Sequence, residues 1–212
     1  MDIILQFIDF ILHIDIHLAE FLMDYGLWIY GILFLIIFVE TGFVVMPFLP
    51  GDSLLFAAGA LAAVTGALDP SLLIALLFIA AVLGDALNYH VGAYIGPKVF
   101  DKNYRFINQQ HLLKAKSFFD EYGGKTVIFA RFLPFVRTFT PFVAGVSGMN
   151  YQRFFVYNAI GGFCWTASFI LLGFFFGNQP VIKDNFTYVI VGIIVFTALP
   201  VLIGFVKNKM GQ

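Results

Sequence analysis

The segment 126–149, TVIFARFLPFVRTFTPFVAGVSGM, is apolar enough to enter a lipid bilayer, yet it carries two arginines and two prolines. An arginine in hydrocarbon costs roughly 2.5–3.5 kcal/mol on insertion scales, so Arg131 and Arg137 need a partner, a water-filled cavity or an anionic ligand. Pro134 and Pro141 remove backbone donors and are expected to break the helix where the arginines lie. Because broken backbone at membrane depth survives only inside protein or along a polar cavity, the segment predicts a re-entrant hairpin with a positively charged site.

The composition of the 212 residues is that of a polytopic membrane protein. Hydrophobic residues make up 60% and charged residues 12%, which excludes an ordinary soluble domain and a disordered chain. Residues 1–97 hold nine acids and no Lys or Arg, whereas residues 98–212 hold all twelve basic residues and four acids. The basic linker 98–125 and the terminal residues 207–212 are therefore expected in the cytoplasm. Nucleic acid is not an expected partner of so apolar a chain.

Residues 3–23 predict an amphipathic helix that lies in the membrane interface. Charged residues interrupt its apolar positions too often for a spanning helix. His13 and His17 are four residues apart and could hold a metal, but no third ligand is evident. A polar stripe that faces the headgroups is the favoured interpretation, and no metal or cofactor is expected.

Residues 27–68 predict a first helical hairpin. Its first arm, 27–46, has the length of a span at about 20 residues but contains Glu40, whose charge is costly there unless it is paired or protonated. Two prolines and a glycine break the chain at 47–52. The second arm, 54–68, is short and rich in small residues, which favours close packing between helices. We expect this hairpin to enter the membrane only partway.

Three further segments predict spanning helices by their length and apolar character. Residues 71–95 are the clearest of the three, 154–177 are expected to span as well, and 186–206 is expected to form a C-terminal transmembrane helix. Gly96 and Pro97 are expected to end the first of these helices, since proline interrupts the backbone hydrogen bonds of a helix.

The order of these elements repeats along the chain. An interfacial amphipathic helix, a proline-broken hairpin and a spanning helix occur in residues 1–97 and again in 98–177. Both hairpins contain Phe-Leu-Pro, and both continue to a similar tetrapeptide, Phe56-Ala-Ala-Gly59 in the first and Phe142-Val-Ala-Gly145 in the second. If each hairpin returns to its starting side, the two repeats are inverted, which is how many secondary transporters place a site near the midplane. The expected fold is one all-α membrane domain over 1–212.

Four charged residues at the helix breaks are the main candidate site. Glu40 and Asp52 lie in the first hairpin, and Arg131 and Arg137 lie in the second. If the hairpins meet, opposite charges offset part of each other's desolvation. Arginine suits multidentate recognition of phosphate, and burial favours the protonated form of a carboxyl group. The pattern predicts an anion site coupled to protonatable acids, with a purely structural salt-bridge core as the alternative.

Three polar residues in the predicted spans are supporting candidates. Asp85 and Asn88 are three residues apart and share one face of a helix, and Asn158 lies in a later span. They could pin the hairpins through structural contacts or touch a ligand directly. The sequence has no nucleophile–base signature, so an enzyme is not expected, although a membrane-embedded enzyme stays open.

Four motifs resemble the signature of the DedA family, which belongs to the VTT-domain (SNARE-associated) group. These motifs are Glu40-Thr-Gly, Pro47-Phe-Leu-Pro-Gly-Asp52, Gly84-Asp-Ala-Leu-Asn-Tyr89 and Phe129-Ala-Arg-Phe-Leu-Pro-Phe-Val-Arg137. The run FIDFILHIDIHLAE at 7–20 is similar to enterobacterial members. The resemblance implies a bacterial inner-membrane protein with two opposed re-entrant hairpins.

The resemblance also implies an activity. It is the movement of phospholipid or polyprenyl phosphate between leaflets, in several members linked to the proton-motive force. The acids and arginines named functional in such members match Glu40, Asp52, Arg131 and Arg137. Translocation of undecaprenyl phosphate, with lipid and protons as partners, is the leading hypothesis. A phospholipid scramblase or flippase, for example of phosphatidylethanolamine, and a non-transporting structural or assembly factor are the alternatives. A homo-oligomer is compatible with the sequence.

Overall fold

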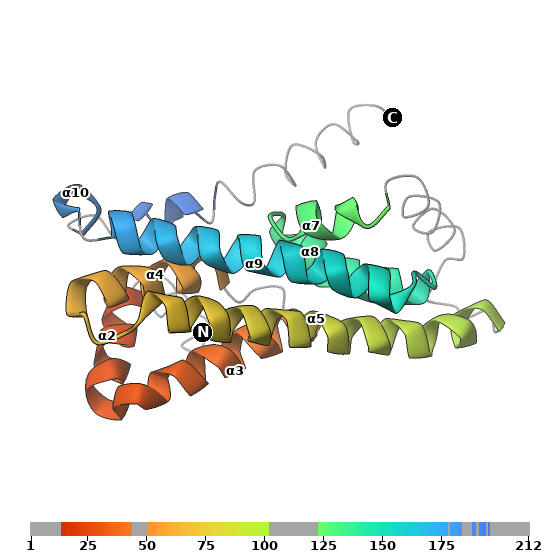
Figure 1. The fold of residues 1–212 in the computed structure, drawn as a ribbon, viewed down its shortest axis with the longest axis horizontal. Coiled ribbons are helices and arrows are strands. Elements are labelled where there is room, and N and C mark those ends of the chain that lie inside the picture. Colours follow the sequence, from red (N-terminus) through yellow and green to blue (C-terminus); the bar gives the residue numbers. More distant parts are fainter. Residues whose placement is uncertain are drawn as a thin grey trace, which may run out of the picture. The chain divides into compact units, whose positions relative to one another are not determined.

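A computed structural model of the protein describes residues 14–43, 51–101, 123–177, 179–183, 188–189, 191–193 and 195. These residues form helices joined by turns, with no strand among them (Figure 1). The helices are α2 (Ile14–Tyr25), η1 (Gly26–Trp28), α3 (Ile29–Gly42), α4 (Gly51–Thr65), α5 (Pro70–Asp101), α7 (Lys125–Ala130), α8 (Pro134–Val146), α9 (Tyr151–Phe176) and α10 (Pro180–Lys183).

Three helical stretches are long and apolar enough to cross a membrane, namely Glu20–Gly42, Pro70–Ile95 and Tyr151–Phe176. The first runs from the end of α2 through η1 and α3, and the others lie in α5 and α9. The expected all-helical membrane class is confirmed to this extent. The predicted span 186–206 lies mostly outside the described residues, and its described residues are helical.

The chain divides into two compact units that combine segments far apart in the sequence. Unit 1 comprises Met1–Ile36, Phe48–Leu77 and Trp165–Gln212, and unit 2 comprises Ile37–Pro47 and Phe78–Cys164. The helices α3, α5 and α9 contribute residues to both. That 1–212 is one domain made of two repeats stays a prediction.

Two predicted helix breaks are wrong. α5 continues through Gly96 and Pro97 to Asp101, because glycine lacks the Cβ that would clash with the ring of a following proline. Pro141 also lies inside a helix, α8. Arg137 is therefore a helical residue, and its carbonyl loses the usual backbone donor, since proline has no N–H.

The break predicted at Pro134 is present, between α7 and α8 in unit 2. Residues 131–133 form a turn, and Leu133 has the extended φ of −117° and ψ of 105° at the N-cap of α8. Pro134 occupies the first turn of α8, where a missing N–H removes no helical hydrogen bond. With 6 and 13 residues, neither α7 nor α8 approaches the roughly 20 residues of a span.

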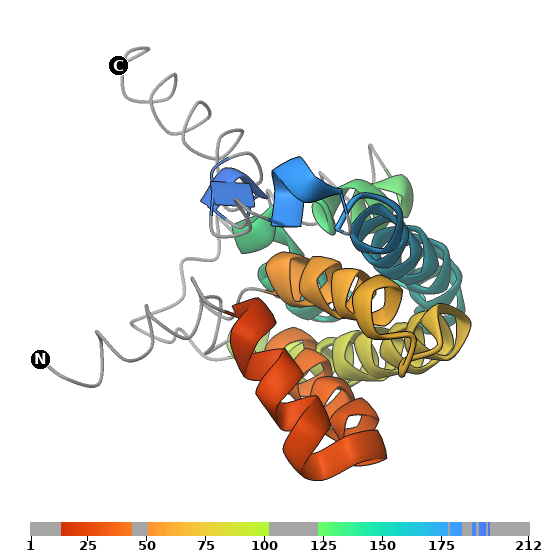
Figure 2. The ribbon, with the colours of Figure 1, turned by 90° about the vertical axis from the view of Figure 1, so that its left-hand side faces the viewer.

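The short helix α4 is enclosed within unit 1. Its residues 51–62 are all buried, and α2 packs against it (Figure 2). Gly59 of α4 lies directly against the carbonyl of Ile170 on α9, and Gly173 of α9 lies against the carbonyl of Phe56. The two backbones therefore approach so closely that a side chain at either glycine would collide with main-chain atoms.

The same crossing pattern occurs in unit 2 between α8 and α5. Gly145 of α8 lies against the carbonyl of Tyr89 on α5, and Gly92 of α5 lies against the carbonyl of Phe142. In both units the glycine of a Phe-x-x-Gly segment on the short helix contacts a carbonyl of the long helix. A glycine three residues later on the long helix contacts the carbonyl of the segment's phenylalanine. The tetrapeptides that resemble each other in sequence thus make equivalent contacts.

Gly145→Ala is expected to destabilise the protein by about 1–3 kcal/mol, because the added Cβ overpacks a backbone contact. The Cβ would lie 2.7 Å from the nitrogen of Ala93. Gly31→Ala is the matched control, since no heavy atom would lie within 4 Å of its Cβ and alanine favours the helix. Thermal unfolding in detergent should separate the two variants, and equal melting temperatures would contradict the crossing.

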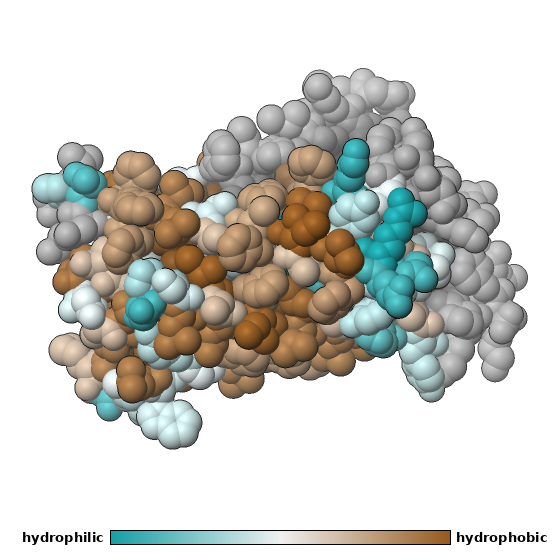
Figure 3. Space-filling model, in the orientation of Figure 1, coloured by the Kyte–Doolittle hydropathy of each residue, from teal (hydrophilic) through white to brown (hydrophobic). Residues whose placement is uncertain are grey.

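Apolar side chains are exposed along the long helices. On α5 the exposed residues Leu72, Ile79, Leu83, Leu87 and Val91 recur at helical spacing. Figure 3 shows apolar side chains over most of the described surface in that view. Exposed apolar area of this extent marks contact with a membrane or a partner, and the candidate polar residues of α5 lie on its opposite, buried face.

Candidate functional site

A buried polar cluster lies in unit 2, where the break between α7 and α8 meets α3, α5 and α9. Each of its charged or amide side chains belongs to a residue at most 8% exposed. Its members are Glu40 on α3, Asp85 and Asn88 on α5, Arg131 at the break, Arg137 on α8 and Asn158 on α9. Four charged groups in so enclosed a place require mutual pairing.

Glu40 and Arg137 form an ion pair within this cluster. The Nη2 group of Arg137 donates to Oε1 of Glu40. Glu40 lies in the last turn of α3, and Arg137 lies one turn into α8. The pair joins an acid of the predicted first hairpin to an arginine of the second, which is the condition under which opposite charges offset part of each other's desolvation.

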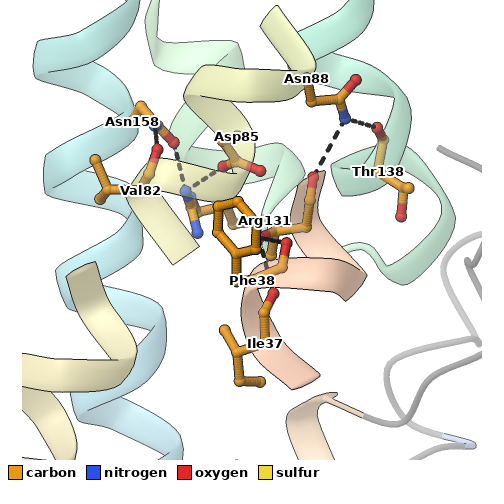
Figure 4. A network of polar contacts seen from close by, with 9 residues as sticks. Ile37, Phe38, Val82, Asp85, Asn88, Arg131, Thr138 and Asn158 are labelled. Carbon is orange, nitrogen blue, oxygen red and sulfur yellow. Dashed lines mark hydrogen bonds and ion pairs between the residues drawn. The ribbon is translucent and has the colours of Figure 1, made fainter. Parts of the chain in front are cut away.

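Arg131 pairs with an acid outside the first hairpin. Its Nη2 group donates to Oδ2 of Asp85 and to Oδ1 of Asn158 (Figure 4). Asn158 in turn donates through Nδ2 to the carbonyl of Val82 at 3.2 Å. The Nε group of Arg131 is buried and has no hydrogen-bond partner among the described residues. Asp85 and Asn158 therefore make the structural contacts that the sequence allows, and a contact with ligand stays a prediction.

Asn88 ties α3 to α8 beside the ion pair. Its Nδ2 group donates to the carbonyls of Thr41, at 3.3 Å, and Thr138, at 2.8 Å (Figure 4). Thr41 follows Glu40 and Thr138 follows Arg137 in the chain. The carbonyl of Thr41 lies in the last turn of α3, where carbonyls have no helical donor. One amide thus fixes the backbone on both sides of the Glu40–Arg137 pair.

The two ion pairs share one electrostatic environment. Arg137 interacts electrostatically with both Asp85 and Arg131. When Glu40 and Asp85 are ionised, the two acids offset the two arginines. An added anion would make the cluster negative unless an acid takes up a proton. The arrangement can therefore couple binding of an anion to protonation of a carboxyl group.

Asp52 lies in unit 1 and has a different partner. Its Oδ1 accepts a hydrogen bond from Nε1 of Trp165 at 2.8 Å, and Trp165 is fully buried. The carboxylate lies in the first turn of α4, where the helix dipole favours negative charge. Trp165 is not among the residues that the sequence predicts for the site. A buried indole N–H needs an acceptor. An acid in another apolar segment is therefore the sequence feature that could have indicated this contact.

The predicted histidine pair is only partly described. His17 lies in α2, with Nδ1 3.4 Å from Oε2 of Glu20, and His13 lies outside the described residues. Across the described part of the chain, no three His, Cys, Asp or Glu residues gather as metal ligands. Residues 47–50 of the first break and most of the basic linker 98–125 also lie outside it.

Comparison with known proteins gives matches over most of the chain. The VTT domain family model matches residues 49–175. Protein DedA of Escherichia coli strain K12 is 51% identical over 211 residues, which cover 99% of this chain and 96% of that protein. An uncharacterized membrane protein of Mycobacterium leprae is 44% identical over 79% of this chain and 75% of its own. The inner membrane protein YqjA of E. coli K12 is 36% identical over 72% and 70%. No solved structure matches.

Proposed function

Because the chain belongs to the DedA family of VTT-domain membrane proteins, we propose that it moves a phosphate-bearing lipid between the leaflets of a bacterial inner membrane. The ion pair between Glu40 and Arg137 carries this proposal. Arg137 supplies a positive charge inside an apolar protein, and its partner can be exchanged. It lies on α8 just after the break, and Glu40 lies in the last turn of α3. Undecaprenyl phosphate is the leading substrate, and a phospholipid such as phosphatidylethanolamine is the alternative.

Exchange of the partner of Arg137 is the proposed binding step. Protonation of Glu40 removes its negative charge, so that Arg137 can turn its planar guanidinium to a phosphate group. Release of the proton restores the Glu40–Arg137 pair and expels the phosphate. Lipid and proton are thus bound together and released together, which links transport to a proton gradient.

Arg131 and Asp52 complete the proposed site. Arg131 adds a second positive charge for the phosphate. Its buried Nε–H has no hydrogen-bond partner among the described residues and is available to donate to the phosphate. Asp52 is proposed as the second acid that exchanges protons, held by the indole of Trp165. A structural role is the alternative for Arg131, because Asp85 and Asn158 already pair with it inside the protein.

Two inverted repeats are the proposed framework for this exchange. The matched glycine crossings of α4 on α9 and of α8 on α5 support it, as does the similarity of the two Phe-x-x-Gly tetrapeptides. Inverted repeats with broken helices place a site near the membrane midplane and allow access from either side.

The basic linker 98–125 and the C-terminus are proposed to face the cytoplasm. With Lys209→Cys in a Cys164→Ser background, a membrane-impermeant thiol reagent should label the protein only after the cells are opened. Labelling of intact cells would place the C-terminus outside, as expected if 126–149 formed one full span.

Proteoliposomes test the function itself. Purified protein should move fluorescent polyprenyl phosphate to the opposite leaflet faster than protein-free liposomes do, and an inward proton gradient should alter the rate. Labelled phosphatidylethanolamine in parallel vesicles distinguishes the two substrates. If neither lipid moves while a known scramblase works in the same vesicles, the structural or assembly role is favoured. Native mass spectrometry of lipid that co-purifies would name the substrate.

A further inference from the structure

Arg131 is held by side chains of long helices and not by its own broken segment. Asp85 lies in the middle of the 32-residue helix α5, and Asn158 lies in the third turn of the 26-residue helix α9. Both accept from Nη2 of Arg131. The amide of Asn158 has a fixed orientation, because its Nδ2 donates to the carbonyl of Val82. The guanidinium is therefore tied to two elements at once (Figure 4).

The backbone of α9 completes the enclosure of Arg131. A Cβ at Gly161 would lie 3.1 Å from Cδ of Arg131, and a Cβ at Gly162 would lie 3.4 Å from its Cζ. The first distance is shorter than most side-chain contacts and the second is an ordinary van der Waals contact, so a Cβ at Gly161 would press on the arginine and one at Gly162 would touch it. The two glycines form a slot that limits the positions open to the guanidinium.

We propose that Asp85 and Asn158 are positioning residues, which hold Arg131 ready for the lipid phosphate without touching the lipid themselves. This inference rests on the proposed function, and it divides the work of the two arginines. Arg137 exchanges Glu40 for the phosphate, whereas Arg131 keeps its protein partners and presents a charge that is already in place.

Preordering of this kind has a measurable effect on affinity. A long side chain that becomes ordered only when ligand binds weakens the affinity, by about two- to tenfold for each such side chain. Arg131 is already ordered by its hydrogen bonds to Asp85 and Asn158 before the ligand binds. Removal of either partner should therefore weaken phosphate binding, but only while Arg131 is present.

A double-mutant cycle tests the proposal with a short-chain prenyl monophosphate as the probe. Its dissociation constant is measured in detergent for Asp85→Asn in the wild-type protein and in an Arg131→Gln background. We expect Asp85→Asn to raise the constant by about two- to tenfold in the wild type and to change it by less than about twofold in Arg131→Gln. Asp69→Asn, the same substitution at an exposed helix cap, is the control and should leave the constant unchanged.

Asn158→Ala is a second test that leaves the Asp85–Arg131 ion pair in place, should Asp85→Asn fail to fold. It should show the same dependence on Arg131. An equal loss of affinity in both backgrounds would mean that Asp85 or Asn158 acts on the lipid directly, and would overturn the proposal. A gain in affinity for Asp85→Asn would mean that Asp85 competes with the phosphate, and would overturn it too. If the wild-type protein does not bind the probe, the proposed function fails, and this inference fails with it.

Discussion

Asp85→Asn is expected to lower the free energy of unfolding by about 3–5 kcal/mol, because it leaves the buried charge of Arg131 without its carboxylate. Arg131 is 3% exposed and Asp85 4%, so water cannot replace the lost partner. The asparagine can accept one hydrogen bond, but it carries no charge. Chemical or thermal unfolding in detergent should show the loss directly.

Two further variants separate this effect from a general loss of packing. Asp69→Asn should be nearly neutral, because Oδ1 of Asp69 accepts from the backbone of Ser71 and Leu72 at the start of α5, and asparagine caps helices equally well. The double variant Asp85→Asn with Arg131→Gln should recover most of the stability, because no unpaired charge remains. A stable Asp85→Asn variant would show that the ion pair does not hold the cluster together.

Glu40→Gln is expected to abolish the pH dependence of lipid translocation. Glutamine keeps a hydrogen-bond acceptor for Arg137 but mimics the permanently protonated acid. The exchange of Glu40 for phosphate at Arg137 then no longer depends on protonation. A rate limited by one protonation changes by up to about tenfold per pH unit, and in the variant the change should be below about twofold. Like Asp85→Asn, the change leaves a buried arginine without its carboxylate and lowers the free energy of unfolding. Lipid binding by the folded protein should persist, since Arg137 is no longer neutralised.

Proteoliposomes with matched internal and external pH give this measurement. Glu20→Gln serves as the control, because Glu20 is an exposed acid on α2. A Glu40→Gln variant that retains the wild-type pH profile would remove Glu40 from proton coupling. A variant that neither binds nor folds would indicate that the carboxylate is structural.

The chemistry of the cluster could be predicted from the sequence because buried charge is expensive. Arg131 and Arg137 in an apolar segment demand acids, and Glu40 is an acid in another such segment. The partner of each arginine could not be predicted in the same way. The Arg131–Asp85 pair joins residues 46 positions apart, and the rotation of α5 about its axis decides which arginine Asp85 meets.

The fold was predictable where periodicity and small residues dominate. The small residues of 54–68 predict close helix packing, and Gly59 makes such a contact in the structure. Prolines were less reliable. Pro134 begins a helix, whereas Pro141 and Pro97 lie within one, because a neighbouring glycine or tertiary contact can outweigh the lost hydrogen bond. The link between Asp52 and Trp165 spans 113 positions and depends on tertiary structure alone.

The double variant Glu40→Gln with Arg137→Gln tests the central claim most directly. It removes both charges of the pair, so no buried charge is left unpaired, and the protein should fold and insert as the wild type does. If the pair is the site at which lipid phosphate and proton are exchanged, this stable variant should move polyprenyl phosphate across proteoliposomes no faster than protein-free vesicles do. Wild-type translocation by the double variant would contradict the account, because the Glu40–Arg137 pair would then serve only to hold α3 against α8.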